Sequence, residues 1–161
     1  MITRIIVEGS DCSGKSTVVD RVKNALHWDS KSLHHREGSQ FARYLKEYAT
    51  NENIVFDRSH FSEEVYSNLW RGGSPFSKPE KQILDGICSI DTLIIFTCPP
   101  AEVLKERYLK RGYEQQIRLE ELEKSRELFC SEFNGIPHRL YLSKNYGELE
   151  ELIREVKERV K

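Results

Sequence analysis

Short apolar runs alternate with longer amphipathic segments along the chain. Uninterrupted runs within residues 2–8, at 54–56 and within 91–97 are typical of strands that are covered on both faces of a parallel sheet. Weaker candidates for strands lie at residues 32–35 and 140–142. The pattern therefore predicts five strands.

Between these strands, apolar side chains recur every three to four residues, which is the spacing of amphipathic helices. Several helix ends carry local signals: Ser59 is a good N-cap, Ser77 and Glu80 form a capping box, and Gly112 closes a helix that starts after a Pro-Pro pair. We expect helices over about residues 13–26, 39–48, 59–71, 78–88, 100–112, 119–133 and 146–160. The alternation predicts a single domain over residues 1–161: a three-layer α/β fold with a five-stranded parallel sheet flanked by helices.

The first strand runs directly into the motif G-x-x-x-x-G-K-S, which leads into the first helix. Its glycines, Gly9 and Gly14, allow a tight loop whose backbone N–H groups point at phosphate oxygens, Lys15 reaches the β- and γ-phosphates, and the Ser16 hydroxyl ligates Mg²⁺. A fortuitous glycine-rich turn is disfavoured because strand, loop and helix follow one another in the required order. The motif predicts ATP and Mg²⁺ as ligands, held by Gly9, Ser10, Asp11, Cys12, Ser13, Gly14, Lys15, Ser16 and Thr17.

In a parallel α/β sheet, ligands bind beyond the carboxyl ends of the strands. Asp57 and Arg58 follow a buried strand, so a carboxylate and a guanidinium are expected in the site. Asp57 can hold Mg²⁺ directly or through water, beside Ser16, and Arg58 can clamp a phosphate with two hydrogen bonds. The alternative is a structural ion pair at the end of the strand.

A third basic group consists of Arg107, Lys110, Arg111 and, beyond a polar segment, Arg118. Phosphoryl transfer depends on positioning and charge stabilisation, which an arginine-bearing lid at about residues 112–119 would supply. Basic residues also gather at helix ends because of the helix dipole alone, and this interpretation stays open.

Taken together, these motifs resemble those of the thymidylate kinase and deoxynucleoside kinase group of P-loop kinases, over most of the chain. The segment 36–38 resembles that group's R-E-P-G, and the segment 57–66 resembles D-R-Y-x-x-S-x-x-A-Y with Ser59 in place of the tyrosine. The Cys-Pro-Pro turn at 98–100, with two arginines after it, is similar to the group's strand, proline turn and double-arginine helix. The segment 117–120 is similar to the group's lid sequence D-R-x-E, here without the aspartate. The compact chain resembles phage-encoded members of the group.

The resemblance implies roles for particular residues. Asp11 would contact the sugar 3′-hydroxyl of the acceptor, and Cys12 stands where some thymidylate kinases carry a catalytic arginine. A catalytic arginine would then come from the lid, Arg118 first, then Arg111 and Arg107. The resemblance assigns the acceptor to Asp11, Arg36, Glu37, Arg58, Ser62 and Tyr66, and catalysis to Lys15, Asp57, Arg58, Arg118, Arg111 and Glu37.

The leading hypothesis is transfer of the γ-phosphoryl group of MgATP to a thymidylate-like deoxynucleoside monophosphate. A deoxynucleoside kinase, with Glu37 as the base that takes the proton of a 5′-hydroxyl, is the alternative. A kinase that acts on a nucleotide in DNA and a nucleotide-binding switch without phosphoryl transfer are further alternatives. An assay with panels of nucleosides and monophosphates separates the first two hypotheses from each other and from these two.

The motifs and the resemblance imply a small-molecule nucleotide or nucleoside as the acceptor, and the composition argues against two other kinds of partner. The 161 residues carry a net charge of −1, which argues against binding to duplex DNA, and no apolar run has the length of a membrane span. The first strand starts too early to leave room for a signal peptide, and the four cysteines form no C-x-x-C pair, which is typical of a reducing cytoplasm. A homodimer is expected only because relatives form one.

Overall fold

The protein was analysed as a computed structural model that describes residues 1–50, 52–112, 117–134, 139–142 and 146–160. Its centre is a five-stranded sheet with the order β2-β3-β1-β4-β5, in which every neighbouring pair is parallel. The strands are β1 (Arg4–Glu8), β2 (Asp29–Ser32), β3 (Ile54–Asp57), β4 (Thr92–Thr97) and β5 (Arg139–Leu142). The predicted parallel α/β architecture is confirmed.

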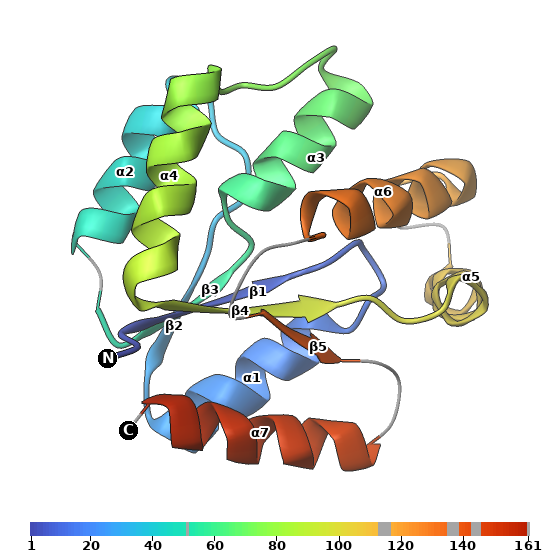
Figure 1. Cartoon of the computed structure of the whole chain (residues 1–161). Helices are drawn as coiled ribbons and strands as arrows, with labels where there is room; N and C mark the ends of the chain where they lie inside the picture. The colour runs from blue at the N-terminus through green and yellow to red at the C-terminus, as the bar shows by residue number, and fades with distance from the viewer. Residues whose placement is uncertain (51, 113–116, 135–138, 143–145, 161) are drawn as a thin grey trace.

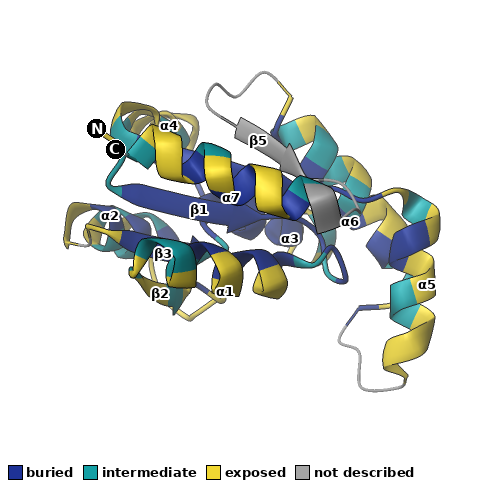
Figure 2. Ribbon diagram, turned by 90° about the horizontal axis from the view of Figure 1, so that it is seen from below, coloured by how far each residue is buried: buried dark blue, intermediate teal, exposed yellow. Residues whose placement is uncertain are grey.

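Helices cover both faces of this sheet (Figures 1 and 2). The helices are α1 (Lys15–Leu26), α2 (Gln40–Thr50), α3 (His60–Trp70), α4 (Lys78–Asp91), α5 (Ala101–Arg111), α6 (Leu119–Glu132) and α7 (Tyr146–Val160). Figure 1 shows α1 and α7 on one face, and α2, α3, α4 and α6 on the other, with α5 at the side. Among the described residues, no helix combines the length and apolarity required to cross a membrane.

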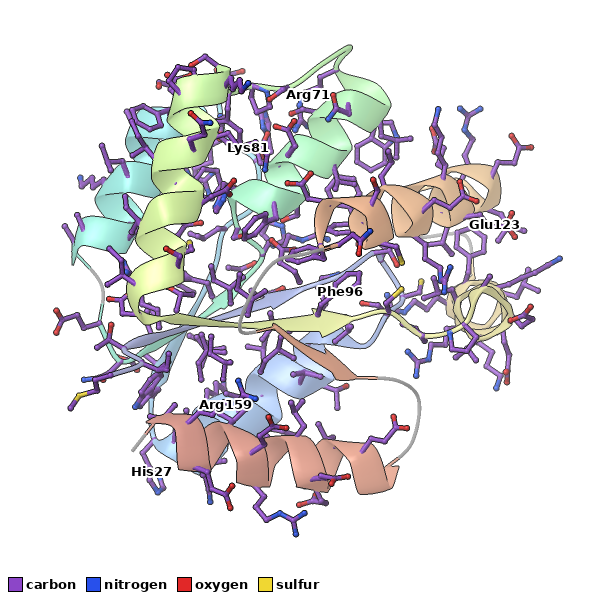
Figure 3. All side chains as sticks on the ribbon, in the orientation of Figure 1. His27, Arg71, Lys81, Phe96, Glu123 and Arg159 are labelled. Atoms are coloured by element: carbon purple, nitrogen blue, oxygen red, sulfur yellow. The ribbon has the colours of Figure 1, made fainter. Side chains whose placement is uncertain are left out.

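Two apolar cores hold the layers together. The smaller one packs β-strand residues against α1 and α7, and it is built from Val, Ile and Leu side chains. The larger one, under α2, α3, α4 and α6, is rich in aromatic rings: Phe96 of β4 stacks on Phe133 with ring centroids 4.6 Å apart, and Phe61 lies 4.9 Å from Phe133. Figure 3 places Phe96 on β4, next to the central strand β1 and under α6. The larger, aromatic core therefore fixes the helices that border the candidate site.

The register of the strands determines where the site lies. Val7 of β1 pairs with Asp57 of β3, and Glu8 pairs with Phe96 of β4. The three strands therefore end together, and the loops that follow them emerge at one edge of the sheet.

The second strand is the main error of the sequence analysis. It spans Asp29–Ser32 instead of residues 32–35, and its residues are half-buried or exposed. Because β2 is an edge strand with polar side chains, it carries no apolar signal. Leu33, just after it, is the buried residue, and its N–H donates to the carbonyl oxygen of Asp57 at 2.9 Å. Helix α4 also continues three residues beyond the predicted end at residue 88.

Phe129 of α6 provides a test of the aromatic core. It is fully buried, and its ring lies 5.6 Å from that of Tyr66 and 6.4 Å from that of Phe96. We expect Phe129→Ala to lower the free energy of unfolding by about 3–5 kcal/mol, measured by urea denaturation. Ile90→Ala, at a residue that is 78% exposed, is the control and should change it by less than about 0.5 kcal/mol. Similar losses in both variants would contradict the assignment of this core.

Candidate active site

The loop between β1 and α1 has a conformation that requires glycine at two points. Gly9 has a φ of 148°, and a Cβ atom there would lie 2.3 Å from the carbonyl oxygen of Thr97. Gly14 has a φ of 96° and precedes α1. The loop is also fixed by side chains, because the hydroxyls of Ser13 and Thr97 are 2.6 Å apart and Thr97 donates to the carbonyl oxygen of Glu8 at 3.0 Å. The predicted phosphate-binding loop is therefore held by β4 as well as by its own sequence.

Lys15 lies under this loop with only 7% of its surface exposed, and its Nζ donates to the carbonyl oxygen of Ser10 at 2.8 Å. Burial and, to a smaller extent, the nearby Arg58 guanidinium together lower the pKa of Lys15 to about 8, against the opposing effect of the Asp11, Asp57 and Glu8 carboxylates. An anionic ligand in the loop would stabilise the charged form and raise this pKa. The position and the lowered pKa of Lys15 are compatible with the predicted contact with a phosphate.

Asp57 and Ser16 provide oxygen atoms near the same loop. Asp57 ends β3, and its Oδ1 is buried without a hydrogen-bond partner in the described part of the chain. Ser16 is exposed in the first turn of α1. Within that part of the chain there is no cluster of three His, Cys, Asp or Glu side chains that could hold a metal by itself. One carboxylate and one hydroxyl fit Mg²⁺, which takes its other ligands from phosphates and water.

Arg58 connects the phosphate loop with the space beside it. Its Nη2 donates to Oδ1 of Asp11 at 2.7 Å, and its guanidinium lies 5.1 Å from the centroid of the Tyr66 ring. Its φ of 75° is unusual for a residue with a side chain, and its N–H donates to the carbonyl oxygen of Val7 at 3.1 Å. Such local strain persists where the surroundings hold it, and functional sites are common places for it.

The sequence analysis missed the role of Glu8, the last residue of β1. Its side chain is fully buried, and Oε1 accepts hydrogen bonds from Ser59 Oγ at 2.6 Å and from Ser62 Oγ and N at 3.0 and 3.2 Å. Burial raises the pKa of Glu8. The signal in the sequence is an acidic residue that ends an otherwise apolar strand. Glu8 ties the strand before the phosphate loop to the first turn of α3, immediately after Arg58.

A cavity of about 420 Å³ opens beside Asp11 and Arg58. Four of the predicted acceptor residues, Asp11, Arg58, Ser62 and Tyr66, line it together. The remaining lining residues are Leu33, His34, His35, Glu63, Trp70 and Arg71, of which Leu33, Glu63 and Arg71 were not indicated by the sequence analysis. Glu63 and Trp70 share one face of α3 with the predicted Tyr66, and their spacing of three, four and seven residues is visible in the sequence once the helix is known.

A buried carboxylate is held at one wall of the cavity. Oε1 of Glu63 accepts hydrogen bonds from His35 Nδ1 at 2.7 Å, from Arg71 Nη2 at 2.5 Å and from Ser67 Oγ at 3.3 Å. Arg71, which follows α3 (Figure 3), also donates to Ser67 Oγ at 2.7 Å. The cavity therefore has a second polar region besides that formed by Asp11 and Arg58.

Other predicted residues lie outside this arrangement. Arg36 and Glu37 are exposed and do not line the cavity. Arg111 is exposed at the end of α5, and Arg118 is paired with Glu121 at 3.1 Å with 80% of its side chain exposed. Residues 113–116 of the predicted lid lie outside the described residues.

Arg107, the third choice among the lid arginines, is the one that contacts the phosphate loop. Its Nη1 donates to the carbonyl oxygen of Cys12 at 3.1 Å, and it lies 3.3 Å from the position of a Cβ at Gly14.

No family model matches the chain. It is 24% identical over 118 residues to the SPbeta prophage-derived uncharacterized protein YorR of Bacillus subtilis strain 168, which covers 70% of this chain and 72% of YorR. The crystal structure of YorR, in complex with phosphorylated GDP, superposes with a TM-score of 0.81 at 21% identity and covers 98% of this chain and 95% of YorR.

Named kinases have the same architecture. Deoxyadenosine kinase from M. mycoides with bound dATP gives a TM-score of 0.66 at 14% identity, over 96% of this chain and 99% of the kinase. The fold is that of a P-loop kinase. Thymidylate kinase from Candida albicans gives a TM-score of 0.59 at 17% identity, over 99% and 91% of the two chains. The resemblance to the thymidylate kinase and deoxynucleoside kinase group is thus confirmed at the level of the P-loop kinase fold.

The buried lysine of this P-loop kinase fold gives a prediction for pH. The folded protein holds Lys15 with a pKa of about 8 against an ordinary value of 10.5, so keeping it charged costs folding free energy at neutral pH. Lys15→Met should therefore raise the free energy of unfolding without ligand at pH 7, by up to about 3 kcal/mol at 1.36 kcal/mol per pKa unit. The difference in the free energy of unfolding between Lys15→Met and the wild type should shrink as the pH rises from 8 to 10, because wild-type Lys15 loses its proton in this range.

Urea denaturation of both proteins at pH 7, 8, 9 and 10 measures this difference. A difference that stays constant over the four pH values would show that Lys15 is not titrating in this window.

Proposed function

We propose that the chain transfers the γ-phosphoryl group of MgATP to the phosphate of a deoxynucleoside monophosphate. The observation that supports this most is the position of Arg58, which lines the cavity and is bound to Asp11 of the phosphate loop. A guanidinium at the junction of a donor loop and an acceptor cavity is suited to align two phosphates, because its fork can bind phosphate oxygens in pairs.

The remaining roles that we propose combine the positions of the residues with the roles that the family resemblance implies. Lys15 and the loop amides bind the donor phosphates, and Asp11 takes the sugar hydroxyl of the acceptor. Ser16 and Asp57 would hold Mg²⁺, which neutralises charge on the transferring phosphoryl group when bound. Arg107 adds a positive charge at the loop, through its contact with Cys12.

The acceptor base that fits this cavity best is guanine. A carboxylate only accepts hydrogen bonds, and guanine has two adjacent donors, N1–H and the N2 amino group, with the acceptor O6 beside them. Glu63 can accept from these donors while Arg71 donates to O6. Thymine presents a single donor between two acceptors and fits the pair less well. The YorR crystal structure, which contains phosphorylated GDP, supports this proposal.

A deoxynucleoside kinase is the second candidate. The fold similarity to deoxyadenosine kinase, with its TM-score of 0.66, favours it. The base for a 5′-hydroxyl would then be Glu37, and the exposed position of Glu37 outside the cavity counts against this alternative.

The decisive assay measures ADP release from MgATP with panels of deoxynucleosides and deoxynucleoside monophosphates. We expect turnover with monophosphates and not with nucleosides, and a loss of about 100-fold in kcat/KM for Arg58→Ala because one charged contact to the acceptor phosphate is removed. Arg43→Ala is the control, since Arg43 lies on α2 over the Tyr44 ring and does not line the cavity. Faster turnover with nucleosides would favour the second candidate, and no stimulation by either panel would favour a nucleotide switch or a polymeric acceptor.

Glu63→Gln tests the choice of base. The amide keeps the size of the side chain but loses the charge, so kcat/KM for dGMP should fall by about 10-fold or more and the value for dTMP should change little. Glu64→Gln, at a neighbouring residue outside the cavity lining, is the matched control. A wild-type preference for dTMP, or an equal loss for all acceptors, would contradict the assignment of guanine.

A further inference from the structure

One wall of the cavity is physically connected to helix α6. Trp70, which ends α3, stacks on Tyr66 with ring centroids 4.9 Å apart and an interplanar angle of 14°, and 43% of its surface is exposed. Its Nε1 donates to Oε1 of Glu121 at 3.2 Å. The bond joins a side chain that lines the cavity to the first turn of α6.

The same carboxylate holds Arg118. Oε2 of Glu121 accepts from the backbone N–H of Arg118 at 2.9 Å, and Oε1 accepts from its Nη2 at 3.1 Å. Oε1 is therefore shared between the indole of Trp70 and the guanidinium of Arg118. In this geometry the Arg118 guanidinium is bound to Glu121.

Arg118 is attached to the phosphate loop by its preceding residue. Ile117 is 2% exposed and belongs to a small apolar cluster with Cys12 of the loop, Leu104 of α5 and Leu122 of α6. The backbone at Arg118 is thus anchored next to the phosphate loop, while its side chain is bound to Glu121, which in turn is bound to Trp70 of the cavity lining. Glu121 stands between the two.

We propose that Glu121 is a positioning residue that couples occupancy of the acceptor cavity to the release of Arg118 toward the donor phosphates. This inference rests on the proposed kinase function. With the cavity empty, Trp70 orients the Glu121 carboxylate and Glu121 retains Arg118. An acceptor that contacts Trp70 shifts the indole and removes one of the hydrogen bonds that orient Glu121.

The ion pair between Arg118 and Glu121 that then remains is weak enough for Arg118 to leave it for another anion. Arg118 is 80% exposed, and solvent-exposed pairs at this spacing contribute little by themselves. A triphosphate offers more negative charge and more acceptor oxygens than one carboxylate, so Arg118 transfers to it. The arrangement would keep the arginine from promoting hydrolysis of ATP when no acceptor is bound, as in enzymes that complete their site only around the correct substrate.

The test is the hydrolysis of MgATP in the absence of any acceptor. Trp70→Phe removes the indole donor and keeps the ring, and Glu121→Gln removes the charge that holds Arg118. Both variants should raise acceptor-independent hydrolysis at least threefold and lower the ratio of acceptor-stimulated to unstimulated turnover. Adding Arg118→Ala to either variant should return hydrolysis to the wild-type rate. Glu123→Gln, at an exposed residue of α6 (Figure 3), is the matched control and should leave both rates unchanged.

Unchanged hydrolysis in the Trp70 and Glu121 variants would overturn the proposal. If the chain is a kinase and only this coupling is wrong, acceptor-stimulated turnover persists with an unaltered ratio. If the proposed function itself is wrong, the wild-type protein shows no stimulation by any acceptor.

Fluorescence gives a readout that does not depend on turnover. The chain has two tryptophans, so Trp28→Phe leaves Trp70 as the single emitter. Titration with each of the four deoxynucleoside monophosphates should shift its emission for the acceptor that binds, and Glu121→Gln should change the starting emission. The absence of any shift with all four would overturn the proposal.

Discussion

The hydrogen bonds between the Glu8 carboxylate and the first turn of α3 connect the two halves of the site. Glu8 is followed at once by the phosphate loop, and its partners Ser59 and Ser62 follow Arg58 directly. The loop proposed to bind the donor and Arg58, which lines the cavity proposed for the acceptor, therefore share one buried anchor. A buried carboxylate costs folding free energy unless it accepts hydrogen bonds. The first turn of α3, which donates those bonds to Glu8, therefore has few alternative positions. The geometry of Arg58 depends on this constraint, and so does the unusual φ at that residue.

The charges around the loop are balanced so that a polyanion completes them. Lys15 and Arg58 are close enough that each disfavours the other's charge, and Asp11, Asp57 and Glu8 offset part of that repulsion. Phosphate groups would relieve the repulsion between the cations, while the buried and unpaired oxygen of Asp57 is suited to a metal ion that accompanies them. The site is thus organised around ligands of opposite charge.

Local sequence patterns predict the phosphate loop and its surroundings, and they do not predict much of the lining of the cavity proposed for the acceptor. The phosphate loop and Asp57 follow apolar strands whose burial on both faces is visible in the sequence, and α3 begins at a clear N-cap. Strand β2 has no such signal, because an edge strand can be polar. The pairing of Glu63 with His35 joins residues 28 positions apart in sequence, and no periodicity specifies it. Arg36 and Glu37 show the converse, since the motif that includes them is recognisable although neither side chain lines the cavity.

For this reason, resemblance to P-loop kinases predicts the proposed ATP site of this chain better than the proposed acceptor site. Every P-loop kinase faces the same triphosphate, so a short motif with fixed backbone geometry is enough to hold it. The acceptor cavity is assembled from helix faces and a strand end, and its polar wall at Glu63 and Arg71 lies outside the phosphate-binding motif. A change of one side chain there alters which hydrogen bonds a base can make without disturbing the donor loop. The thymidylate-like motifs of this chain are therefore compatible with a cavity that selects a different base.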